Sequence, residues 1–277
     1  MTASDATEAG GESGMKESTQ GFIRARSPEN RELRRQSILD AAERLLDKAQ
    51  VADITLRDVG RQAGIATSNV LRYFENREAV FLELLNREYG AWLDALPAEL
   101  APADDDGSGT ASPVRDFADA YAASLVARPV MCELASVLAG VLERAVSVET
   151  VRAYKRRALA NNDRLAGIIH ARMPELDQAA AKELASATIV LIAGLWPLAH
   201  PGPTVVAAVE DPALLAAHVD FPARYSRMIE LLAGSLQYPA APRFERGGAA
   251  ATASTTPPTP ATAAARGASV RRRTPPR

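Results

Sequence analysis

The feature that most constrains the fold is the spacing of apolar residues, which repeats with the period of a helix. From Ile38 onward, apolar residues recur at i, i+3, i+4, i+7 and i+8, as Ile38, Ala41, Ala42, Leu45 and Leu46 show. Such residues lie on one face of a helix. Neither an alternating strand pattern nor an Asn-Gly or Asp-Gly hairpin signal is present. The sequence therefore predicts an all-α fold.

The same spacing predicts further helices, and capping residues mark several of their starts. Thr55 and Asp58 form a capping-box pattern that opens a short helix. Asn76 can cap a longer helix, which we expect Pro97 to end. Helical patterns then cover residues 114–127, 129–146, 148–173, 175–199 and 222–236. These elements indicate a small N-terminal helical module followed by a larger helical bundle.

Composition separates two tails from the folded parts. Residues 1–27 and 239–277 hold too little apolar surface to offset the entropy of ordering them, so we expect both to be disordered. Between them lie the small module, over 28–80, and the larger one, over 81–238. Residues 243–277 contain seven Arg and one Glu. This basic, Ala/Thr/Pro-rich tail is either a weak, salt-sensitive binder of polyanions or a solubilising extension.

Several classes of protein are disfavoured by what the chain lacks. Its formal net charge is −2, so the chain as a whole is not a polycation. A single cysteine, Cys132, excludes an internal disulfide framework and fits a reducing cytoplasm. The three histidines form no metal-ligand spacing, and no nucleophile–base pair or phosphate-cradling loop is visible. We therefore predict no metal, no cofactor and no enzymatic activity.

No segment has the pattern of a membrane anchor or a signal peptide. Residues 1–20 lack the apolar core that a signal peptide needs. The longest apolar stretch, 185–199, is interrupted by Ser186, Thr188 and Pro197, and is shorter than the ~20 residues of a membrane span. We expect this stretch to be a buried helix of a soluble, cytoplasmic protein that does not associate with membranes.

Residues 54–78 carry the strongest functional signal. They predict a short helix over 55–63, a tight turn in which Gly64 takes a positive φ, and a second helix over 67–74. The two helices share an apolar wedge made of Leu56, Val59, Ala63, Ile65, Val70 and Phe74. The second helix turns outward Thr67, Ser68, Asn69, Arg72 and Tyr73. Hydroxyl and amide groups suit base edges, and Arg and Tyr suit phosphates or guanine, so the segment predicts a reader of the DNA major groove.

This segment resembles the helix-turn-helix of the TetR (tetracycline-repressor-like) family of bacterial transcriptional repressors. The resemblance rests on the Ala-Gly-Ile-Ala turn at 63–66, the Tyr-Phe pair at 73–74, the Arg-Glu-Ala-Val start at 77–80 and the opening helix at 38–46. It is specific over about residues 33–85. Over 114–237 it consists only of helical pattern and length. It implies a DNA-binding set of Thr55, Arg57, Thr67, Ser68, Asn69, Arg72, Tyr73 and Arg77.

Two departures from the family pattern concern the local helices. Ala66 stands where a capping Ser is common, so we expect Thr67 or Ser68 to supply the cap and the helix to start a residue late. Gly60 stands where Ala is usual. It costs about 1 kcal/mol of helix propensity unless close packing requires a glycine.

Other departures concern contacts with the DNA backbone. Leu71 replaces a frequent Tyr, which weakens the expectation of a phosphate contact there. Arg77 replaces a frequent Lys and retains a cation. Five arginines precede or open the first helix, namely Arg24, Arg26, Arg31, Arg34 and Arg35. They form either an arm that reaches phosphates or the minor groove, or a solvated run of charge.

The resemblance further implies a homodimer that binds a palindromic double-stranded DNA operator and responds to a small-molecule effector. Half-sites one turn apart require recognition helices ~34–36 Å apart, so a small change in spacing costs binding. Stretches 185–199 and 222–236 are the candidate dimer helices. Their apolar faces are Ile189, Ile192, Leu195 and Trp196 on one, and Tyr225, Met228, Ile229 and Leu232 on the other. Any of these residues could equally belong to an intramolecular core.

The candidate effector site is mostly apolar. Its residues are Tyr121, Leu125, Met131, Cys132, Tyr154, Ile169 and Trp196, with Ala135, Leu138 and Leu165 nearby in pattern. Mixed aromatic residues, a Met and few charges favour a small apolar or aromatic effector, although each residue equally fits ordinary core. The sequence thus predicts a ligand-responsive repressor. The alternative is an all-helical module that binds a ligand or protein and whose head does not read DNA.

Overall fold

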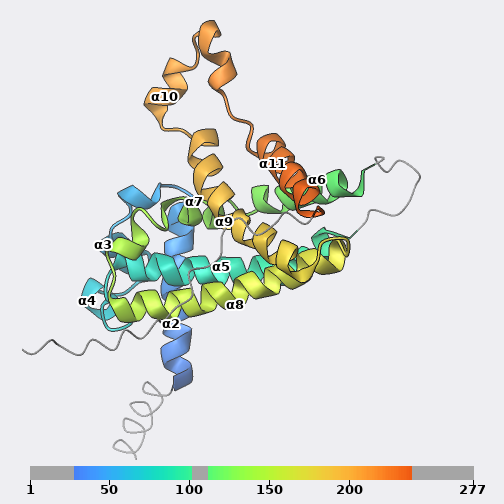
Figure 1. Cartoon of the computed structure of the whole chain (residues 1–277). Coiled ribbons are helices and arrows are strands. Elements are labelled where there is room, and N and C mark those ends of the chain that lie inside the picture. The colour runs from blue at the N-terminus through green and yellow to red at the C-terminus, as the bar shows by residue number, and fades with distance from the viewer. Residues whose placement is uncertain (1–27, 102–111, 239–277) are drawn as a thin grey trace, which may run out of the picture. The chain divides into compact units, whose positions relative to one another are not determined.

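The computed structural model describes residues 28–101 and 112–238, and every regular element within these ranges is a helix (Figure 1). The all-α prediction is confirmed. The N-terminal head contains α2 (Pro28–Leu46), η1 (Val51–Asp53), α3 (Leu56–Gln62) and α4 (Thr67–Val70). The body contains α5 (Arg77–Glu99), α6 (Pro113–Val126), α7 (Pro129–Val137), η2 (Leu142–Arg144), α8 (Val148–Arg172), α9 (Gln178–Ala199), α10 (Pro203–Ala208), η3 (Pro212–Ala217) and α11 (Phe221–Leu236). The expected tails lie outside the described residues.

Helix α5 joins the head to the body because it belongs to the core of both. It packs against α2 in the head and against α6, α7 and α8 in the body. Its buried residues are Ala79, Val80, Phe81, Leu82, Leu84, Leu85, Trp92, Leu93 and Leu96. A helix buried at both ends in this way cannot shift without disturbing one core or the other.

Aromatic rings connect the body helices through the centre of the bundle. The ring of Trp92 lies 5.6 Å from that of Tyr121, which lies 6.1 Å from that of Tyr225. The polar ends of the first two rings are hydrogen-bonded: Trp92 Nε1 donates to Ser124 Oγ at 3.0 Å, and the Tyr121 hydroxyl bonds to Thr188 Oγ1 at 2.8 Å. Such bonds offset the cost of burying polar groups and fix how α5, α6 and α9 pack together.

Helix α9 is long and apolar enough to meet the length and composition of a membrane span. Its buried residues, among them Leu184, Ile192 and Trp196, pack inside the bundle. It contacts α7, α8 and α11. This packing agrees with the prediction of a buried helix in this stretch, although one side of α9 remains exposed.

Three predicted helix boundaries in the body were wrong. Pro97 does not end α5, because it lies in the last turn, where a missing N–H removes only one helical bond, and the helix continues to Glu99. The helix expected over 129–146 ends at Val137, and Gly140, a poor helix former, follows before η2. Helix α9 begins at Gln178 and not at 175, because Asp177 caps it by accepting a hydrogen bond from the Ala180 N–H at 2.8 Å.

The turn between α3 and α4 requires glycine at two positions. Gly64 has φ of 69°, as predicted, and the Ile65 N–H donates to the Gly60 carbonyl at 2.9 Å, which closes a Schellman motif. A Cβ at Gly60 would lie 2.9 Å from the carbonyl oxygen of Ile65. Close backbone packing therefore explains the glycine at position 60.

Arg77 ties the start of α5 to the segment before α3. Its Nη1 lies 2.7 Å from the carbonyl oxygen of Ile54 and 3.3 Å from those of Val51 and Ala52. Its Nε donates to Glu78 at 2.7 Å. One guanidinium thus satisfies carbonyls of η1 and of Ile54, the residue that follows it.

We expect Gly60→Ala to lower the free energy of unfolding by about 1–3 kcal/mol, because the new methyl group meets a backbone carbonyl that cannot turn away. Gly90→Ala on α5 is the matched control, since a Cβ there has no heavy atom within 4 Å. That change should be neutral or stabilising by up to about 1 kcal/mol. Urea unfolding followed by circular dichroism measures both. Equal effects of the two substitutions would contradict the close-packing explanation.

Arg77→Ala should destabilise the protein by about 1.5–3 kcal/mol, because it removes a charged donor from partly buried carbonyls. Arg72, an exposed arginine for which the described residues provide no ion pair, is the control, and Arg72→Ala should change stability by no more than about 0.5 kcal/mol. Thermal unfolding of both variants provides the comparison. An Arg77→Ala variant as stable as the wild type would show that the three carbonyl contacts contribute nothing.

Candidate nucleic-acid interface

Helix α3 is fixed at both ends by local hydrogen bonds. Thr55 Oγ1 accepts from the Asp58 N–H at 3.2 Å, and Asp58 Oδ2 accepts from the Thr55 N–H at 3.0 Å. The capping box predicted from the sequence is therefore confirmed. The Thr55 hydroxyl also donates to Asp58 Oδ2, and this bond, together with the one from the Thr55 N–H, holds the pKa of the Asp58 carboxyl below its usual range. The hydroxyl of Thr55 is committed to this cap.

Helix α4 is shorter than predicted and lacks the expected cap. It ends at Val70, and residues 71–73 form turns instead of the helix predicted to reach 74. Its N-cap is Ala66, without a side-chain bond, so neither Thr67 nor Ser68 caps it and the start is not delayed. The first N–H groups of α4 consequently have no side-chain partner, as at other uncapped helix starts.

The wedge between α3 and α4 forms as predicted. Val59 and Val70 are fully buried, Phe74 is 5% exposed, and Leu56, Ala63 and Ile65 pack against them. With these apolar residues inward, Ser68, Asn69 and Arg72 are exposed, and Thr67 and Tyr73 are half-buried. Tyr73 packs against the buried hydrophobic core, which leaves less of its side chain accessible than the sequence suggested.

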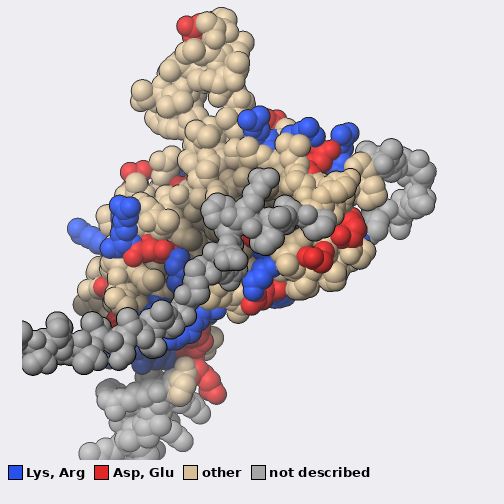
Figure 2. Space-filling view, in the orientation of Figure 1, with Lys and Arg blue, Asp and Glu red and all other residues tan. Residues whose placement is uncertain are grey.

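Cationic side chains surround this exposed face. Arg57 and Arg61 on α3 are exposed, and Arg61 is paired with Asp58. Arg31 and Arg34 on α2 are exposed, whereas Arg24 and Arg26 lie outside the described residues. Figure 2 shows Lys and Arg side chains on the end of the molecule that carries α3 and α4.

Two arginines expected to face DNA have partners within the protein. Arg77 bonds to the carbonyls described above and is no longer expected to contact a phosphate. Arg35 donates from Nη1 to the Tyr73 carbonyl at 3.1 Å, and its guanidinium carbon lies 4.6 Å from the centre of the Phe74 ring. Arg35 therefore holds the end of the recognition segment, residues 67–74, and is not part of a free arm.

Ion pairs connect this end of the head to the body. Glu83 on α5 accepts hydrogen bonds from Nη1 and Nη2 of Arg157 on α8, at 2.7 and 2.6 Å. The same carboxylate lies 3.5 Å from Nη2 of Arg35. Glu75 Oε1 also accepts from the Ser147 N–H at 2.8 Å, which joins the loop after α4 to the start of α8.

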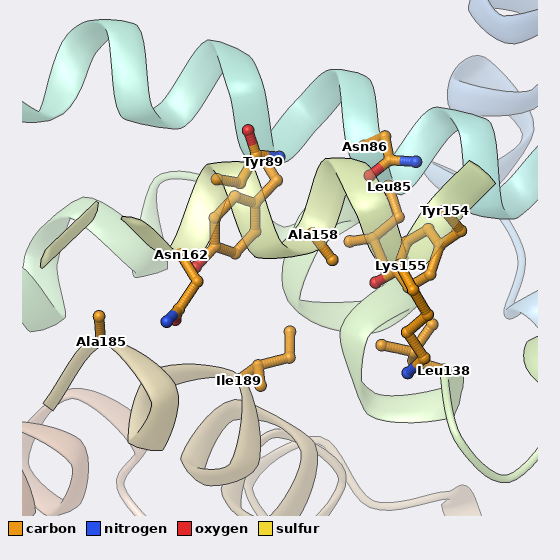
Figure 3. Close-up of a pocket in the computed structure, with 11 residues that line it drawn as sticks. Leu85, Asn86, Tyr89, Leu138, Tyr154, Lys155, Ala158, Asn162, Ala185 and Ile189 are labelled. Atoms are coloured by element: carbon orange, nitrogen blue, oxygen red, sulfur yellow. The ribbon is translucent and has the colours of Figure 1, made fainter. Parts of the chain in front are cut away.

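A cavity of about 140 Å³ lies between α5, α8 and α9 (Figure 3). Its apolar lining residues are Leu85, Leu138, Ala158, Ala185 and Ile189. Its polar lining residues are Asn86, Tyr89, Tyr154, Lys155, Asn161 and Asn162. Figure 3 shows Tyr89 from α5, Tyr154 from α8 and Ile189 from α9 pointing toward the same space. This cavity is the candidate effector site.

The effector residues expected from the sequence separate into two groups. Tyr154 lines the cavity, as does Leu138. Tyr121, Leu125, Met131, Cys132 and Ile169 are at most 1% exposed and belong to the packed core. Trp196, 6% exposed, also lies outside the cavity lining and donates from Nε1 to Glu133 Oε2 at 3.2 Å. Amide residues such as Asn161 and Asn162 were missed, because polar residues on a helix usually face solvent; two adjacent Asn in a helix were the available signal.

Burial changes the chemistry of the titratable groups in the body. Desolvation raises the pKa of the Tyr89 and Tyr154 phenols, so both remain protonated. It raises the pKa of the Cys132 thiol to about 12, which leaves an unreactive, neutral thiol. Within residues 28–101 and 112–238, no three His, Cys, Asp or Glu side chains are grouped to hold a metal ion. His170 and His200 instead contact the carbonyls of Leu176 and Trp196.

The chain is similar to two families of known sequences. Residues 38–84 match the family described as bacterial regulatory proteins, tetR family, and residues 86–237 match the tetracyclin repressor-like C-terminal domain. No curated protein matches the chain.

Solved structures with a similar arrangement include three regulators. The fatty acid degradation regulator FadR from Bacillus halodurans is 15% identical, with a TM-score of 0.45 over 74% of this chain and 97% of its own. The repressor AlkX from Dietzia is 16% identical, with a TM-score of 0.44 over 76% and 96%. FadR from Bacillus subtilis, in complex with stearoyl-CoA, is 16% identical, with a TM-score of 0.43 over 72% and 97%.

The two family matches together cover the head and the body, and the second alone covers more than half of the chain. They confirm the resemblance inferred from the helix-turn-helix. The chain belongs to the TetR family of bacterial transcriptional regulators.

Proposed function

We propose that this regulator is a repressor that binds a palindromic operator as a homodimer and leaves it when a small molecule occupies the cavity between α5, α8 and α9. The observation that carries the proposal is the exposed Ser68, Asn69 and Arg72 on a recognition segment whose wedge is fully packed. Because these polar side chains are exposed and the helices that carry them are packed together, they can enter a major groove without any change in the fold of the head. The alternative of a head that does not read DNA is not favoured by the family.

The proposed dimer uses the outer sides of α9 and α11. The faces of α9 and α11 that the sequence suggested for the dimer instead pack inside the monomer, where Ile192, Tyr225 and Ile229 are fully buried. The opposite sides carry apolar residues that the monomer leaves exposed: Val190 at 68%, Leu198 at 61% and Leu231 at 55%. A twofold contact between these sides would bury them and set the distance between the two heads.

The proposal places the protein in the cytoplasm, where its operator is, and gives it no catalytic step and no contact with membranes. The regulation then depends only on the free energies of binding of the effector and the operator. A ligand that fits better when α5 and α8 have moved lowers operator affinity by the difference between its affinities for the two states. Selection of bound fragments from genomic DNA by the purified protein tests the proposal and gives the operator sequence and its symmetry.

Asn69→Ala should weaken binding to the selected operator about tenfold, because it removes an amide that can read a base edge. Arg72→Ala should also weaken binding and lower the slope of log K against log salt by about 1, as expected for one phosphate contact. Arg164→Ala on α8, which breaks only an exposed pair with Asp94, is the control. Fluorescence anisotropy at several salt concentrations measures all three. Operator affinity unchanged in both head variants would reject this recognition face.

Val190→Arg should convert the dimer to a monomer and reduce operator affinity, because it would bury an unpaired charge at the twofold contact. Leu159→Arg on α8 is the matched control, since Leu159 is similarly exposed, at 66%. Sedimentation equilibrium gives the mass of each variant. A Val190→Arg protein that remains dimeric would place the interface elsewhere.

A further inference from the structure

We infer that the cavity between α5, α8 and α9 takes a neutral monocyclic phenol. This inference rests on the ligand response proposed above and adds the chemical class of the ligand.

The size of the cavity limits the size of the ligand. Its volume is about 140 Å³. An engineered apolar cavity of about 150 Å³ holds benzene, so the space fits one six-membered ring with small substituents. Leu85 and Ile189 on facing helices provide apolar walls for such a ring. A long acyl chain would require the helices to separate.

The polar groups in the lining set the second limit. No other described residue hydrogen-bonds the hydroxyls of Tyr89 and Tyr154 or the side-chain amides of Asn86 and Asn161. Asn162 is different, because its Nδ2 donates to Ser186 Oγ at 3.2 Å. A purely apolar ligand would displace water and leave these groups unmatched, at a cost for each. A ligand hydroxyl, which both donates and accepts, complements amides and phenols together.

The charges in the lining set the third limit. Lys155 is the one charged residue among those that line the cavity, and its Nζ lies 2.6 Å from Glu143 Oε1. The ammonium is therefore already paired with a carboxylate. A carboxylate on the ligand would have to compete with Glu143 or remain unpaired in a partly desolvated site. Phenol is uncharged at neutral pH and avoids this cost.

Isothermal titration calorimetry on the full chain tests the inference with four probes: phenol, benzoate, toluene and palmitoyl-CoA. Phenol should bind more tightly than the other three. Ala158→Phe fills the cavity and should abolish phenol binding. Leu159→Phe is the control, because Leu159 is the next residue on α8 and is exposed, so binding should be unchanged.

A second variant keeps the test decisive if Ala158→Phe does not fold. Asn161→Leu retains side-chain size but removes the amide, so it should weaken phenol binding about tenfold and leave toluene binding unchanged or tighter. A merely structural effect of the substitution would weaken both probes equally. Tighter binding of benzoate, toluene or palmitoyl-CoA than of phenol, absence of phenol binding, or phenol binding that survives in Ala158→Phe would overturn the inference.

A second measurement, whether the protein stays on its selected operator when a probe binds, distinguishes a failure of this inference from a failure of the proposed function. If phenol binds in the cavity and the protein stays on its operator, the ligand class stands and the proposed release fails. If palmitoyl-CoA alone binds and releases the operator, the proposed function stands and the inference fails.

Discussion

Helix α5 must satisfy two cores at once, and the rest of the structure depends on that constraint. Val80 and Phe81 lie in its first turns, Trp92 and Leu96 in its last turns, and all four are fully buried. The indole of Trp92 is held by Ser124, and Arg77 at the other end holds the segment before α3. Because both ends are committed, a movement of α5 relative to the body moves the head as well.

Helix α8, which lines the cavity, is connected to residues 67–74, the recognition segment, by polar contacts. Tyr154 and Asn161 line the cavity on α8, and Arg157 lies between them on the same helix. Arg157 binds Glu83, which also lies beside Arg35, and Arg35 bonds to the Tyr73 carbonyl at the end of the recognition segment. A ligand that shifts α8 therefore acts on charges already attached to the head, which is a physical basis for coupling two separate sites.

Local chemistry made the head easy to predict and the cavity difficult. The capping box at Thr55, the positive φ of Gly64 and the wedge of Val59 and Val70 depend on neighbours in sequence, and all were predicted correctly. The cavity lies where α5 meets α8 and α9, which come much later in the sequence. Leu125 and Leu138 both suit an apolar lining by composition, and only packing places one in the core and the other at the cavity.

The sequence by itself determined the helical class, the order of the helices and the reading head, because periodicity, caps and turn residues act over a few positions. Tertiary structure decided which arginines face outward. Arg72 remains exposed, whereas Arg35 and Arg77 are drawn to carbonyls brought near them by folding. It also decided which side of α9 is free. Both sides are apolar, and the side chosen for the core is the one that meets α7, α8 and α11. The charge and hydrophobicity of a side chain follow from the sequence, but the residues that it contacts are decided by the fold.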